Sequence, residues 1–111
     1  MFIALDVTYS LIQSLRPIVP VIQRADPALA DQIRRAATSI SLNLAEGQRS
    51  AKGNKQKHYA IAHGSANEVK SGLMTAQAWG WLDVSAGAAA DAAESLRVLD
   101  RLLALLWRLT H

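Results

Sequence analysis

The sequence contains no cysteine, so disulfide bonds and thiolate metal sites are excluded. Proline and glycine are scarce, at 3 and 6 of 111 residues, which argues against an all-β fold with many tight turns. No apolar run reaches the roughly 18 to 20 residues of a membrane span. The first ten residues carry Asp6 and lack the basic start of a signal peptide. We therefore expect a cytoplasmic protein without a membrane partner.

What is present instead is alanine and leucine. Half of the residues are hydrophobic while only 5% are aromatic. Ala and Leu lose little conformational freedom in a helix, so this composition favours an all-α fold. A chain of 111 residues is long enough for one hydrophobic core and too short for two, which predicts a single domain over residues 1–111.

The first helical segment is predicted over residues 4–24, with apolar or small residues at three- and four-residue intervals. They are Leu5, Thr8, Ile12, Leu15, Val19 and Ile22. Pro17 and Pro20 interrupt this pattern, and an interior proline removes a backbone hydrogen bond. Because the apolar register continues across both prolines, we expect one kinked helix; a break near Arg16 is the alternative. Asp26-Pro27 resembles a helix N-cap followed by proline in the first turn.

The second segment, residues 27–49, has two different faces. One face is apolar or small: Leu29, Ile33, Ala36, Ala37, Ile40, Leu44 and Gly47. The opposite face carries Arg35, Ser39, Leu42, Asn43 and Glu46 at helical spacing. A solvated surface would explain a polar face, but an apolar Leu42 in its middle favours a contact surface.

A loop is predicted over residues 48–54, with Gly47 and Gly53 ending helices and Ser50 and Asn54 as capping candidates. The third segment, residues 54–79, has a strict alternation of three- and four-residue steps, typical of helical bundles. The residues on this seam are Tyr59, Ala62, Ala66, Val69, Leu73, Ala76 and Gly80.

The fourth segment, residues 85–109, follows a turn at residues 80–83. Its predicted seam is Ala92, Leu96, Leu99, Leu103 and Leu106. Leu102, Leu105 and Leu109 add apolar surface, which either widens the core or meets another subunit. Four helices of similar length joined by short turns predict an up-down-up-down antiparallel four-helix bundle.

No arrangement of residues indicates catalysis. There is no Glu-x-x-His pair for a di-iron site, and His58 and His63 are about 140° apart around a helix. The sequence also lacks a Gly-x-Ser-x-Gly elbow and a Gly-Lys-Ser/Thr phosphate loop. We expect no cofactor, no metal and no enzymatic activity.

Basic residues gather between Glu46 and Glu68, a stretch without any acidic side chain. Arg49, Lys52, Lys55 and Lys57, together with Arg34, are candidates for contacts with nucleic-acid phosphates, which would give salt-sensitive binding without base recognition. The alternative is that these charges only solvate a loop.

Residues 32–47, QIRRAATSISLNLAEG, resemble the signature of the bacterial 23S rRNA intervening-sequence protein family. Residues 62–69, AHGSANEV, and the Gly80-Trp81-Leu82 turn resemble two further blocks of that family. The resemblance implies a four-helix bundle that assembles as a homopentamer. Relatives are encoded within insertions in ribosomal RNA genes, and a related accessory protein of diversity-generating retroelements associates with a reverse transcriptase and nucleic acid.

The resemblance also implies a set of polar positions: Arg35, Ser39, Asn43, Glu46, Ser65 and Glu68. We expect some of them to form a buried or inter-subunit hydrogen-bonded network. Two functions follow as hypotheses. The first is a homo-oligomeric accessory protein that binds the RNA or DNA backbone, and the second is a structural oligomer or adaptor that binds another protein.

Overall fold

The computed structural model describes residues 1–111 and contains five α-helices and no strand. The helices are α1 (Ile3–Leu15), α2 (Val19–Ala25), α3 (Pro27–Gln48), α4 (Lys52–Ala78) and α5 (Ala86–Thr110). The predicted all-α class is confirmed. The predicted number of helices is wrong, because α1 and α2 occupy the place of a single first helix.

The break between α1 and α2 lies at residues 16–18, so the alternative of a break near Arg16 is correct and a continuous kinked helix is not. The backbone N–H of Ile18 donates to Leu15 O at 3.0 Å, and that of Arg16 donates to Gln13 O at 3.3 Å. These are three-residue bonds that tighten and end a helix. Pro17 has no N–H to continue the four-residue ladder. Pro20 lies in the first turn of α2, where a missing N–H has little effect.

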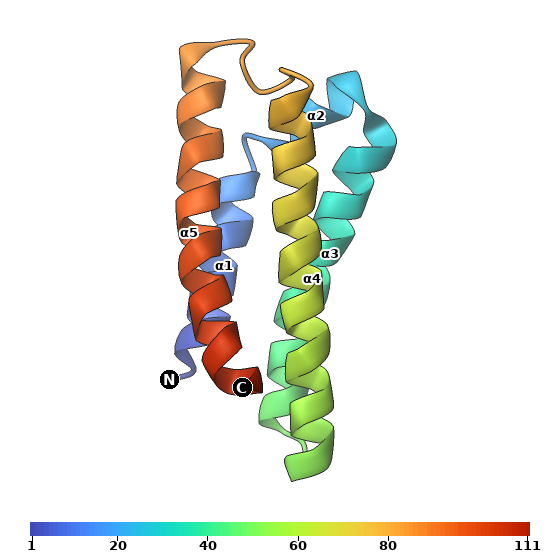
Figure 1. Cartoon of the computed structure of the whole chain (residues 1–111), viewed down its shortest axis with the longest axis vertical. Coiled ribbons are helices and arrows are strands. Elements are labelled where there is room, and N and C mark those ends of the chain that lie inside the picture. The colour runs from blue at the N-terminus through green and yellow to red at the C-terminus, as the bar shows by residue number, and fades with distance from the viewer.

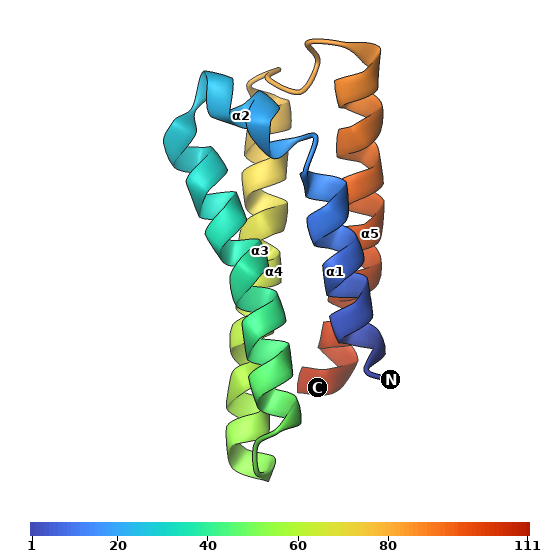
Figure 2. The same ribbon diagram turned by 180° about the vertical axis from the view of Figure 1, so that it is seen from behind.

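The long helices lie side by side and consecutive ones run in opposite directions (Figures 1 and 2). α3 packs mainly against α4, and α1 packs mainly against α5. The short α2 crosses from the end of α1 to the start of α3. The α3–α4 hairpin extends beyond both chain ends and the adjacent ends of α1 and α5. The molecule is therefore elongated, with extents of 45 × 23 × 20 Å.

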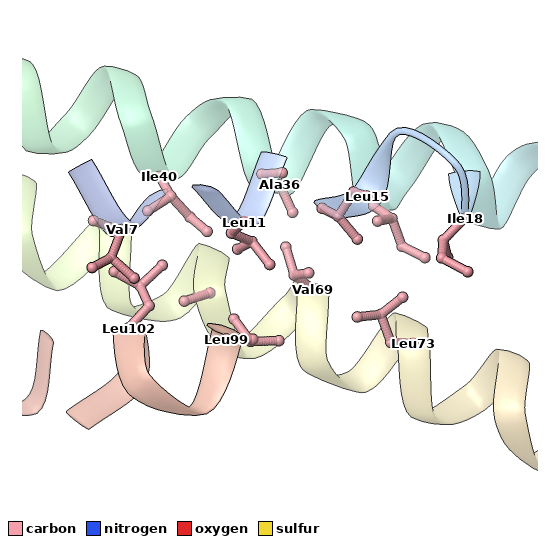
Figure 3. Packing of buried hydrophobic residues seen from close by; sticks show 14 of the residues in the cluster. Val7, Leu11, Leu15, Ile18, Ala36, Ile40, Val69, Leu73, Leu99 and Leu102 are labelled. Atoms are coloured by element: carbon pink, nitrogen blue, oxygen red, sulfur yellow. The ribbon is translucent and has the colours of Figure 1, made fainter. Parts of the chain in front are cut away.

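One hydrophobic cluster of 23 buried residues runs between the helices. Figure 3 shows its centre, where Leu11, Leu15, Ile40, Val69, Leu73 and Leu99 converge from four helices. The predicted apolar face of α3 is buried, apart from the half-buried Leu29. On α4, the predicted seam from Tyr59 to Ala76 is buried as well. The apolar periodicity thus identified the inner faces of both helices.

The seam of α5 differs from the prediction. Leu96 and Leu103 are only half-buried, and their places are taken by Ser95 and Leu102, both with 0% exposure. The two registers have the same three- and four-residue spacing, so periodicity does not distinguish them. The prediction chose the register with more leucines. Ser95 is accepted in the core because its hydroxyl is fully bonded: it donates to Ser14 O at 3.0 Å and lies 2.9 Å from Ser14 Oγ.

The helix break leaves the carbonyl of Ser14 without its usual backbone partner. In a continuous helix Ser14 O would accept from the N–H of Ile18, which here donates to Leu15 O instead. The carbonyl of Ser14 is thereby free to accept from α5. The hydroxyl of Ser95 therefore supplies the hydrogen bond that the break removes from Ser14 O. Leu102 widens the core, while Leu105 and Leu109 are half-buried and pack against its edge.

The α3–α4 connection is shorter than predicted, since only residues 49–51 lie outside the helices. Gly47 and Gly53 are helical and do not end a helix. Ala51 is the N-cap residue of α4, so the predicted caps Ser50 and Asn54 are wrong. Asp26 caps α3 as predicted, with its side chain accepting from the N–H of Leu29 at 3.0 Å.

Two glycines allow close helix contact. A Cβ on Gly47 would lie 2.7 Å from the Tyr59 ring, and one on Gly72 would lie 2.7 Å from Ile33 Cγ1. Gly80, which was predicted on the seam of α4, is exposed in the following turn with a φ of +79°, a conformation that favours glycine.

No helix in the structure combines the length and apolarity that crossing a membrane requires.

Candidate functional site

The basic residues predicted to bind phosphate gather mostly at the projecting end of the α3–α4 hairpin. Arg49 caps the end of α3, and Lys52, Lys55 and Lys57 lie in the first two turns of α4. Lys52 and Lys57 are exposed and Lys55 is half-buried. We call these four residues the basic tip. Its position beyond the ends of α1 and α5 leaves it open to a large partner (Figure 1).

The basic tip places three lysines in the first two turns of α4. The N-terminus of a helix carries partial positive charge, so acidic residues are favoured there. α4 instead has no acidic residue in its first turn and no side-chain cap. None of the three lysines has a carboxylate within 4.0 Å, whereas Arg49 pairs with Glu46 at 2.9 Å. The helix and the lysines therefore add to one positive field.

Arg34 does not belong to the basic tip. It lies near the middle of α3, 15 residues before Arg49 on the sequence, which corresponds to roughly 22 Å along the helix axis. Arg34 lines two hollows beside α3, one along its polar face and one between α3 and the α1–α2 break. The structure thus places one of the five predicted phosphate ligands apart from the other four.

Three of the six family-type polar residues form a hydrogen-bonded group between α3 and α4. Ser65 Oγ donates to Ser39 Oγ at 2.9 Å, and Asn43 Nδ2 donates to the same oxygen at 3.1 Å. Asn43 Oδ1 lies 3.0 Å from His58 Nδ1, which makes His58 a fourth member. We call these four residues the polar cluster.

His58 was missed as a partner of Asn43, although the sequence holds a signal for it. His58 and Ser65 are seven residues apart and lie on one side of α4. Ser39 and Asn43 are four residues apart on α3, which runs in the opposite direction. Two antiparallel helices place such pairs opposite each other, so the spacing matches once the pairing of the helices is known.

The other three polar residues lie outside the polar cluster. Arg35 pairs with Asp31 at 3.0 Å with 81% of its side chain exposed, and Glu46 pairs with Arg49. Glu68 is exposed and lines a hollow of about 360 Å³ between α3 and α4. Within one chain none of them is buried, so a role for these three in a network requires contact with a second subunit.

Two pKa shifts have clear local causes. Burial raises the pKa of Tyr59, the residue that packs beside Gly47 near the basic tip. On α5, the hydrogen bond from Arg97 lowers the pKa of Glu94, and this exposed pair lies outside both groups. No group of three or more His, Asp or Glu residues could hold a metal ion.

The fold and these surfaces define a small all-α protein built from long antiparallel helices, with one basic end and a polar cluster between two helices. Residues 12–103 match the profile of the 23S rRNA-intervening sequence protein family. The chain belongs to this family. Neither the search of curated proteins nor that of solved structures finds a match.

Proposed function

We propose that this protein is a non-enzymatic, homo-oligomeric accessory protein of the cytoplasm that binds the RNA or DNA backbone through the basic tip. The observation that carries this proposal is the unpaired state of Lys52, Lys55 and Lys57 at a projecting helix N-terminus. Anions are stabilised at helix N-termini, and lysines without carboxylate partners keep their charge available for phosphates. Contacts of this kind position a nucleic acid without reading its bases.

The oligomer is proposed from the outer face of α3. Leu42 is 64% exposed in the middle of the polar stripe, and Arg35 and Glu46 lie on the same side with exposed side chains. An exposed leucine flanked by charged residues matches the apolar centre and polar rim of a protein interface. A closed ring would repeat the basic tip around its axis and strengthen its field. The number five rests on the family resemblance.

A direct test compares wild-type protein with the triple variant K52E/K55E/K57E in fluorescence anisotropy with single-stranded RNA and duplex DNA. Loss of three phosphate contacts is expected to reduce the slope of log K against log salt concentration by about 2 to 3 and to abolish binding at about 0.15 M salt. The matched control R24E/R101E/R108E makes the same change in formal charge at exposed arginines elsewhere. Equal loss in both variants, or no binding by wild type at low salt, would contradict the proposal.

The second candidate function is a structural oligomer or adaptor for another protein. It is favoured by Trp79, which is 69% exposed at the opposite end of α4 and stacks on Trp81 with ring centroids 5.8 Å apart. Exposed tryptophans are enriched in protein interfaces. A stoichiometric protein partner that survives nuclease treatment and is lost in Trp79→Ala, but not in K52E/K55E/K57E, would support this function over the first.

A further inference from the structure

A hollow lies at the α1–α2 break, remote from the basic tip along the molecule (Figure 2). This hollow of about 320 Å³ opens between the break and α3. Its apolar wall includes Ile12, Leu15 and Val19. Arg16 and Arg34 line the same hollow. We call this hollow the break pocket.

The break pocket is a consequence of the proline-interrupted chain. Arg16 lies in the turn that ends α1, and Val19 begins α2. A continuous helix would carry these residues past α3 on one straight surface. The break instead bends the chain around a concave space, and Ile12 and Val19 remain half-buried at its wall.

The charges around the break pocket are unbalanced. Neither Arg16 nor Arg34 has a carboxylate within 4.0 Å, and no acidic residue lines the pocket. The adjacent Arg35, by contrast, pairs with Asp31. Arg16 and Arg34 are both exposed and line the same hollow, so an anion seated there is attracted by both guanidinium groups.

We propose that the break pocket binds a small organic anion whose carboxylate or phosphate head pairs with Arg16 and Arg34 and whose apolar body covers Ile12 and Val19. Guanidinium groups bind both kinds of head through charge-assisted hydrogen bonds. The volume is at the lower end of small-molecule sites, which combine apolar walls with a few polar groups. Apolar walls distinguish this pocket from the basic tip, so the inference does not depend on nucleic-acid binding.

Octanoate is the probe for the proposed site, measured by isothermal titration and by amide shifts in ¹H–¹⁵N spectra. We expect saturable shifts confined to residues around the α1–α2 break and the facing part of α3. Octyl phosphate tests whether a phosphate head serves as well as a carboxylate. Inorganic phosphate and 1-octanol supply the head and the body alone, and each is expected to bind at least roughly tenfold more weakly than octanoate.

Variants locate the two halves of the site. Arg16→Ala and Arg34→Ala are each expected to weaken octanoate binding by roughly tenfold, because each removes a charged hydrogen bond. Arg24→Ala is the matched control, an exposed arginine on α2 outside the pocket, and is expected to change affinity less than about twofold. Thr38→Trp, an exposed position on the pocket rim, is expected to block binding without unfolding the protein.

Four results would overturn the proposal. The first is the absence of octanoate-induced shifts at the break pocket, and the second is an equal loss of affinity in Arg24→Ala and the two pocket variants. The third is binding of 1-octanol as tight as that of octanoate, which would show an apolar site without anion recognition. Because arginine stays protonated, binding should be constant between pH 6 and 9; a decline across that range would also contradict the assignment.

Discussion

At the scale of single residues, side-chain size and hydrogen bonding decide how closely neighbouring helices approach each other. Gly72 and Gly64 lie eight residues apart on the same helix, yet their surroundings differ. A Cβ on Gly72 would meet Ile33 Cγ1 at 2.7 Å, whereas nothing lies within 4 Å of a Cβ on Gly64. Helix propensity favours alanine over glycine at both positions. The change in stability on substitution therefore depends on whether a methyl group fits beside the helix.

Gly72→Ala is expected to lower the free energy of unfolding by about 1 to 2 kcal/mol, because the strain of overpacking exceeds the gain in helix propensity. Gly64→Ala is the matched control and is expected to raise it by up to about 1 kcal/mol. Urea denaturation followed by circular dichroism measures both. Stabilisation of the two variants by similar amounts would show that α3 and α4 do not approach as closely as described.

Ser95→Ala tests the bond between α5 and the end of α1. It leaves the carbonyl of Ser14 without its partner in the core and is expected to cost about 1 to 3 kcal/mol of stability. Ser10→Ala is the control, since the exposed Ser10 bonds only to Asp6 O in its own helix. Equal small effects in the two denaturation curves would mean that α5 does not present Ser95 to α1.

At the scale of elements, the start of α4 carries positive charge where a cap and acidic residues would stabilise the helix. α3 and α5 have side-chain caps from Asp26 and Ser85, while α4 begins after Ala51 without one. The first turns of α4 then carry lysines where acidic residues would be stabilising. The three lysines set the start of α4 apart, since α2 also has neither a side-chain cap nor an acidic residue in its first turn.

Ala51→Asp is expected to raise stability by about 1 kcal/mol, because it supplies a cap and complements the helix dipole. The added carboxylate should also weaken RNA binding. Ala51→Ser separates the two effects, since it offers a cap without charge and should leave the affinity nearly unchanged. Thermal denaturation and anisotropy measure them, and unchanged RNA binding by Ala51→Asp would remove this end of α4 from the interface.

At the scale of the whole molecule, the exposed face of α3 around Leu42 is the proposed contact between subunits. Leu42→Glu is expected to convert the oligomer into monomers with unchanged helical content, because it places a charge in the proposed interface. Sedimentation velocity should give about five times the 12.0 kDa of one chain for wild type. Val84→Glu, at an exposed turn position, is the control. A monomeric wild type would exclude this use of Leu42.

Glu46→Ala distinguishes a subunit contact from a contact within one chain. The Glu46–Arg49 pair is exposed on both sides, so its loss should change monomer stability by at most about 1 kcal/mol. A shift in oligomer mass would therefore indicate a role for Glu46 between subunits. Unchanged melting together with unchanged mass would contradict its place in an inter-subunit network.

The sequence by itself determined the helical class and the inner faces of α3 and α4, because apolar spacing near 3.6 residues is a local property of the chain. It also determined the Asp26 cap, which involves only neighbouring residues. Tertiary structure decided the features that depend on contacts between distant segments. Ser95 entered the core because it meets Ser14, 81 positions away. The polar cluster formed because α3 and α4 lie antiparallel, and Arg16 and Arg34 line one hollow because α2 crosses from the end of α1 to the start of α3.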